Sequence, residues 1–106
     1  MKEYKNRTIK IFDTEWKIKF LDKVYTDENT WVFGLSVGAE RTLYISLKDA
    51  NGKPLKDSEI QDTIIHEVIH AVLDTLCFFE ISNNEPAIEW LTKCLIQLEK
   101  QGIFKI

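Results

Sequence analysis

The residues best suited to carry chemistry are the two histidines of the chain, which stand four positions apart in His66-Glu67-Val68-Ile69-His70. Residues four apart lie one turn apart on the same face of a helix, so both imidazoles can reach one metal ion. The carboxylate of Glu67 lies beside them, where it can take a proton from a metal-activated water. This H-E-x-x-H spacing predicts Zn²⁺ as the cofactor, His66 and His70 as metal ligands and Glu67 as the general base.

A zinc site of this kind needs a third protein ligand, with a fourth position left for water. The chain has no further histidine, and both of its cysteines follow the motif, so we expect a carboxylate. The strongest candidate is Glu85, with Glu89 one turn later as a carboxylate that orients a metal-binding imidazole. This like-charged pair is unfavourable on a helix unless the helix N-terminus and a cation offset it. Glu89, Asp74 and Glu80 stay open as alternative third ligands.

Two helices are expected to position these residues. Ser58 and Gln61 have the form of a capping box, which predicts the start of the first helix. Apolar residues then recur at helical spacing: Ile60, Ile64, Val68, Val72 and Leu76, widened by Ile65, Ile69 and Leu73. The second helix is expected to begin at Asn83 or Asn84, with Pro86 in its first turn and Gly102 as its stop. Its predicted buried stripe is Ala87, Leu91, Cys94, Leu95 and Leu98.

The first half of the chain reads as strands, because apolar and polar residues alternate there. The expected strands are 8–12 and 16–20, which form one hairpin, and 31–37 and 42–47, which form a second; residues 49–54 form a loop. The sequence therefore predicts an α+β fold, in which a small antiparallel β-sheet is followed by two packed helices. With 106 residues and no linker-like segment, residues 1–106 are expected to be a single domain.

The composition limits the classes of function. A net charge of −3, with scattered basic residues, argues against nucleic-acid binding. No apolar run is long enough to span a membrane, and the polar N-terminus does not resemble a signal peptide. Cys77 and Cys94 lack metal-site spacing and are expected to be buried thiols in a reducing cytoplasm.

The motif and its surroundings resemble a known family. The chain is similar to zincin metallopeptidases of the gluzincin type, in which H-E-x-x-H is followed on the next helix by a ligand Glu in an Asn-Glu context. Asn84-Glu85, with Glu89 four positions on, matches that arrangement. Over residues 57–98 the plan resembles short phage and mobile-element metallopeptidases, distantly similar to the ImmA/IrrE group. The resemblance implies a zinc endopeptidase that acts on a peptide or protein substrate, and the composition predicts that it is cytoplasmic.

Two further features of the expected enzyme are less specific. Many zincins place a donor opposite the metal, and Tyr44 or Arg41 are the candidates here. The family also suggests that an extended substrate pairs with the edge of strand 42–47. Two alternatives to an active peptidase remain: a catalytically degenerate zincin-like protein that binds metal or protein partners, and a module whose metal is purely structural. The sequence does not indicate the oligomeric state.

Overall fold

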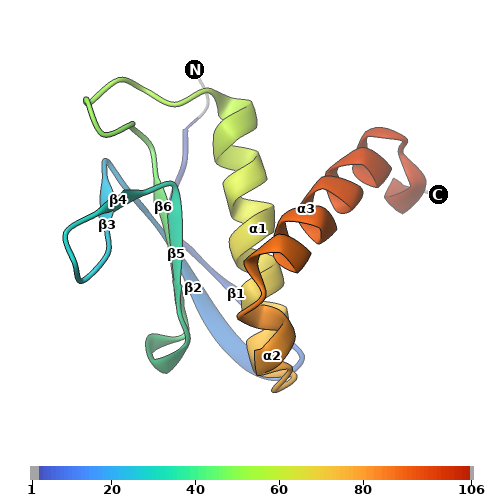
Figure 1. The fold of residues 1–106 in the computed structure, drawn as a ribbon. Helices are drawn as coiled ribbons and strands as arrows, with labels where there is room; N and C mark the ends of the chain where they lie inside the picture. Colours follow the sequence, from blue (N-terminus) through green and yellow to red (C-terminus); the bar gives the residue numbers. More distant parts are fainter. Residues whose placement is uncertain (1–2, 106) are drawn as a thin grey trace.

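The computed structural model describes residues 3–105, which form an α+β fold with a four-stranded mixed sheet, a two-stranded sheet and three α-helices (Figure 1). The elements are β1 (Arg7–Ile11), β2 (Thr14–Leu21), β3 (Val24–Tyr25), β4 (Trp31–Val32), β5 (Gly34–Val37), β6 (Thr42–Ser46), α1 (Asp57–Thr75), α2 (Phe79–Ser82) and α3 (Glu85–Lys100), with 3₁₀ turns at Gly38–Glu40 and Ile103–Lys105. No helix among the described residues is both long enough and apolar enough to cross a bilayer.

The main sheet is mixed, so the prediction of an antiparallel sheet was wrong. Its strand order is β1-β2-β6-β5, and the central pair β2–β6 is parallel while the outer pairs are antiparallel. Both predicted hairpins exist, but β2 of the first pairs in parallel with β6 of the second. The expected strand 31–37 is also divided at Phe33, because β4 pairs with β3 in the small sheet whereas β5 pairs with β6.

Strand β6 lies in the middle of the sheet, between β2 and β5, so the expectation that strand 42–47 offers an edge to a substrate was wrong. The open edge near α1 belongs to β5 instead. Alternation along β6 turns Leu43 and Ile45 toward α1, where both are fully buried. Tyr44 therefore lies on the opposite face of the sheet.

Helix α1 packs across the sheet and forms the core with it. The buried core residues come from β2 (Trp16, Ile18), β6 (Leu43, Ile45) and α1 (Ile60, Ala71). The indole Nε1 of Trp16 donates a hydrogen bond of 2.9 Å to Oγ1 of Thr75, which ties the end of α1 to β2. The helix begins at Asp57, one residue before the predicted cap at Ser58, and the carboxylate of Glu59 accepts the backbone N–H of Lys56 at 3.1 Å.

Helix α3 packs on α1 and projects away from the sheet (Figure 1). It begins at Glu85, and Oδ1 of Asn84 accepts the Ala87 N–H at 3.2 Å, so the predicted cap and the position of Pro86 in the first turn are confirmed. The predicted buried stripe was wrong. Ile88 and Thr92 are the buried residues of α3, while Leu91, Cys94, Leu95 and Leu98 are exposed. Among the described residues α3 packs mainly on α1, so the leucines on its other side stay exposed.

Two smaller expectations also differ from the structure. Cys77 and Cys94 are free, as expected, but both are exposed rather than buried. The short helix α2 between α1 and α3 was not predicted; it redirects the chain so that the start of α3 returns to the middle of α1.

Candidate metal centre

Three side chains from two helices converge beside the middle of α1. One possible ligand atom from each of His66, His70 and Glu85 lies within 4.8 Å of the other two. Nε2 of His66 is 3.3 Å from one carboxylate oxygen of Glu85, and Nε2 of His70 is 3.1 Å from the other. The same group does not include Glu89, Asp74 or Glu80, so the structure brings together the three residues that the sequence favoured.

The separations between these atoms suit a zinc ion. Around a tetrahedral ion with bonds of about 2.0–2.2 Å, neighbouring ligand atoms lie about 3.3–3.6 Å apart. The Nε2–oxygen distances of 3.3 and 3.1 Å are close to that spacing. Two imidazole nitrogens and one carboxylate are also the ligand types of catalytic zinc sites, so the donor set fits Zn²⁺.

The His70 ring has a second contact that sets its orientation. Its Nδ1 lies 3.1 Å from Oγ of Ser82, the last residue of α2 and only 4% exposed. If Nε2 binds a metal, Nδ1 carries the proton and donates it to the serine oxygen. Ser82, rather than Glu89, thus contacts a potential ligand, and the carboxylate of Glu89 forms no ion pair with either imidazole among residues 3–105. Sequence reasoning missed Ser82 because a serine before a ligand helix has no distinctive signature.

Burial also adjusts the charge state of the imidazole. Burial lowers the pKa of His70 below its ordinary value, although the nearby carboxylate of Glu85 opposes that change. The neutral ring is the form that binds metal, so the protein environment favours the ligand state.

Glu67 is the most deeply buried acid near the site, at 6% exposed. Burial, and secondly the negative charge of Glu85, raise its pKa to about 8. A carboxylate so placed holds its proton in the metal-free protein at neutral pH, and a cation beside it would favour the ionised form. Glu67 therefore has the position and the adjustable charge of a general base.

Strand β5 lies close against this part of α1 because Gly34 has no side chain. A Cβ at Gly34 would lie 2.6 Å from Cγ2 of Thr63 and 3.0 Å from Cγ of Glu67. The motif face of α1 is consequently covered, and Thr63, Glu67 and His70 are all buried. The sequence analysis noted Gly34 only as part of a strand; a glycine inside a strand pattern is a signal of close backbone approach.

Two cavities meet at the site. One has a volume of about 450 Å³ and is bordered by all three potential ligands, Glu67, Ser82 and the side of β5. The other, of about 300 Å³, shares His66 and Glu67 with the first and extends between α1 and α3. The two cavities therefore adjoin at His66 and Glu67, and together they are called the cleft.

Neither predicted donor lies in that cleft. Tyr44, on the far face of the sheet, donates its hydroxyl proton to the Glu40 carboxylate at 2.7 Å. Arg41 borders a separate cavity near the end of α1. Asn83, which sequence reasoning considered only as a helix cap, borders the cavity with the potential ligands. A comparison of the chain with protein-family models, with curated proteins and with solved structures found no match.

Proposed function

We propose that the protein is a zinc-dependent metallopeptidase of the zincin type, with a gluzincin-like ligand set. The observation that carries this proposal is the convergence of His66, His70 and Glu85 within 4.8 Å beside a buried acid, Glu67, on the same helix. A structural zinc site gains nothing from an unligated carboxylate next to its first ligand, and it usually fills all four positions with protein atoms.

Each residue then has a defined task. His66 and His70 bind through Nε2 and Glu85 through its carboxylate, while Ser82 holds His70 in the required tautomer. A bound zinc ion would supply Lewis-acid polarisation of a peptide carbonyl and would lower the pKa of a water molecule. Glu67 accepts the proton of the attacking water and passes it to the leaving amine. Asn83, at the border of the same cavity, is the candidate amide donor.

The open edge of β5 is the place where an extended peptide would bind. The N–H of Ser46 donates to the Phe33 carbonyl at 2.8 Å, and hydrogen-bonded pairs alternate along an antiparallel ladder. By this alternation the backbone groups of Gly34 and Ser36 face the open edge. They can pair with a peptide main chain without reading its sequence. Exposed free thiols at Cys77 and Cys94 suit a reducing compartment, so we expect the protein to act in the cytoplasm.

One observation favours the second candidate, a degenerate zincin-like protein that binds metal or a protein partner without turnover. Among the described residues, the two cavities that meet at the site contain no tyrosine or arginine side chain. A peptide could then be held at the site without the donor that many zincins use. The degenerate protein would bind zinc through the same three ligands.

The test measures zinc content and peptide cleavage on matched variants. We expect one zinc per chain in the wild type, and loss of zinc in His66→Ala and in Glu85→Gln. Glu89→Gln is the matched control and should keep its zinc. Glu67→Gln should also keep zinc but cleave a peptide library at least roughly 100-fold more slowly. Zinc with equal cleavage in wild type and Glu67→Gln would favour the degenerate candidate, and a wild type that binds no zinc would refute both.

A further inference from the structure

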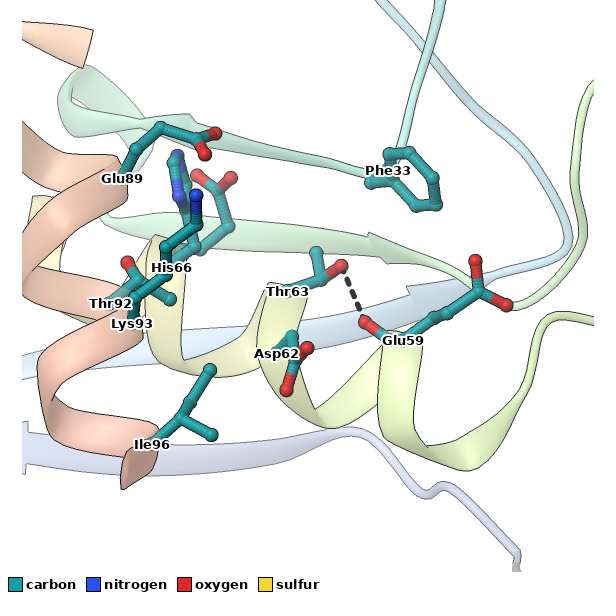
Figure 2. A pocket seen from close by; sticks show the side chains of 10 residues that line it. Phe33, Glu59, Asp62, Thr63, His66, Glu89, Thr92, Lys93 and Ile96 are labelled. Atoms are coloured by element: carbon teal, nitrogen blue, oxygen red, sulfur yellow. Dashed lines mark hydrogen bonds between the residues drawn. The ribbon is translucent and has the colours of Figure 1, made fainter. Parts of the chain in front are cut away.

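The smaller cavity at the site has a chemical character of its own. It has a volume of about 300 Å³ and opens beside His66 and Glu67. Figure 2 shows the residues around it. Glu59, Asp62 and Thr63 form the wall on α1. This wall faces Phe33 on one side and α3 on another, where the lining residues are Glu89, Thr92, Lys93 and Ile96. A side chain next to a scissile bond at the metal centre would enter this cavity.

Part of the lining is apolar. Phe33 and Ile96 contribute apolar surface, and the two threonines add their methyl groups, because their hydroxyls are engaged with their own helices. Oγ1 of Thr63 donates to the Glu59 carbonyl at 2.8 Å (Figure 2), and Oγ1 of Thr92 donates to the Ile88 carbonyl at 2.7 Å. The cavity therefore suits a hydrocarbon chain.

The charged groups of the lining are mostly acidic. Glu59, Asp62 and Glu89 border the cavity, and none of these three carboxylates forms an ion pair among residues 3–105. The one lining cation, Lys93, holds its ammonium 5.1 Å from the centroid of the Trp90 ring. The lining therefore carries more acidic than basic side chains, and Lys93 balances part of the negative charge.

The buried carboxylate of Glu67 indicates that the cleft takes up a ligand. It borders the cavity, is 6% exposed and has no hydrogen-bond or ion-pair partner among the described residues. A buried carboxylate normally has such a partner, because burial without one is costly. Hydrogen-bond donors or positive charge in the cleft would satisfy it, whether they come from the proposed metal and its water or from a neighbouring substrate group.

We propose that this cavity binds a lysine or arginine side chain, so that the substrates are peptides with a basic residue next to the scissile bond. The methylene stem lies against the threonine methyls and the cationic head meets the carboxylate of Asp62, while Glu59 and Glu89 add negative charge toward the two ends of the cavity (Figure 2). This assignment rests on the proposed peptidase function, because it takes the reacting centre to be at His66 and Glu67.

The experiment uses peptides that differ only at the residues flanking the cleaved bond, which are lysine, arginine, norleucine or glutamate. Cleavage is measured with the zinc-loaded wild type, and binding by fluorescence anisotropy with zinc-loaded Glu67→Gln. We expect lysine and arginine peptides to be preferred over norleucine and glutamate peptides by roughly tenfold in both measurements. Asp62→Lys should remove or reverse the preference. Asp62 is exposed, so this change should leave the fold intact.

Glu99→Lys, a charge reversal of the same kind on α3 but outside the cavity, is the matched control and should leave the preference unchanged. Equal treatment of all four peptides would overturn the proposal, as would a norleucine preference that Asp62→Lys does not alter. The peptidase proposal fails separately: if the wild type cleaves no peptide but Glu67→Gln still binds basic peptides better, the cation-binding cavity stands without the enzyme.

Discussion

At the scale of single residues, the site depends on how each side chain is held by its neighbours. The two imidazoles can bind a metal only as neutral rings with Nε2 turned to the same point. Helix geometry brings the rings together, with ring centroids 5.1 Å apart, and the contact with Ser82 orients His70. The hydroxyl of Ser82 can donate or accept, so it can support the ring both with and without a metal.

The first prediction concerns Ser82. Ser82→Ala removes the partner of Nδ1 and frees the tautomer of His70, so zinc affinity should fall by about 10- to 100-fold. Competition titration with a zinc chelator measures the change. Ser58→Ala, an exposed serine near the start of α1, is the control and should bind zinc as the wild type does. Equal affinities for the Ser82 and Ser58 variants would show that the hydroxyl has no orienting role.

The second prediction concerns the raised pKa of Glu67. In the metal-free protein this pKa is about 8, above its ordinary value of 4.5, so the folded state holds the proton more tightly than the unfolded state. The associated stabilisation is complete below about pH 4.5 and is lost as the pH rises through about 8. The glutamine in Glu67→Gln cannot ionise. The stability of this variant relative to the wild type should therefore increase by a few kcal/mol between about pH 5 and about pH 9.

Urea unfolding with excess chelator at the two pH values measures this difference. The contributions of the other titrating groups to the unfolding free energy are shared by the two proteins and cancel. Zinc should reduce the pH-dependent difference between the two proteins, because the cation favours ionised Glu67. A free-energy gap between the two proteins that is the same at both pH values would contradict the raised pKa.

At the scale of elements, the separation between β5 and α1 controls the shape of the cleft. Strand β5 can cover the motif face of α1 only because residue 34 is glycine. The strand is also the open edge of the sheet, so its position sets where a paired peptide would lie relative to Glu67. A small change in this strand should therefore affect packing and catalysis together.

The third prediction is that Gly34→Ala destabilises the protein by about 1–3 kcal/mol, the usual range for forcing an extra group into a packed region. The new Cβ would lie 2.6 Å from Cγ2 of Thr63, a short β-branched side chain that has little room to move. Chemical denaturation measures the loss, and peptide cleavage should fall as Glu67 is displaced. Gly38→Ala is the control, since its Cβ would be 3.5 Å from its nearest neighbour, an oxygen of Asp74. Similar stabilities for the two variants would contradict the tight approach.

The fourth prediction separates the two sides of α3. Ile88 is fully buried against α1, so Ile88→Ala should cost about 2–5 kcal/mol of unfolding free energy. Leu95 is 36% exposed, and Leu95→Ala should cost clearly less. Thermal or urea unfolding of the two variants gives the comparison. A larger loss for Leu95→Ala would mean that the outward side of the helix is packed in solution.

At the scale of the whole molecule, the proposed metal adds a link between helices that already pack on one another. Helix α3 is the outermost layer and packs on α1 rather than on the sheet (Figure 1). The ligands come from α1 and α3, and the orienting serine comes from α2. A bound ion would therefore fix all three helices to one another.

The fifth prediction is that zinc raises the melting temperature by on the order of 10 °C when its concentration is about 100-fold above the dissociation constant. Chelator should reverse the shift. Mg²⁺, which prefers oxygen ligands and octahedral geometry, should not reproduce it. Glu85→Gln should abolish the zinc effect, and an undiminished shift in that variant would place the third ligand elsewhere.

The sequence by itself determined the parts of this protein that depend on local geometry. A helix of fixed period puts His66 and His70 on one face, so the pattern could be read without a fold. The start of α3 was equally readable, because Asn84 satisfies a free backbone N–H and Pro86 suits the first turn. These features need only neighbours close in the chain.

The tertiary structure decided everything that depends on contacts between distant segments. The parallel pairing of β2 with β6, the open edge at β5 and the exposed side of α3 follow from how the layers pack. The placement of Glu85 between the two imidazoles, with Glu89 beyond reach, depends on the turn made by α2. Apolar periodicity indicates that a helix has an apolar face to bury, but only the assembled fold supplies the neighbour that buries this face.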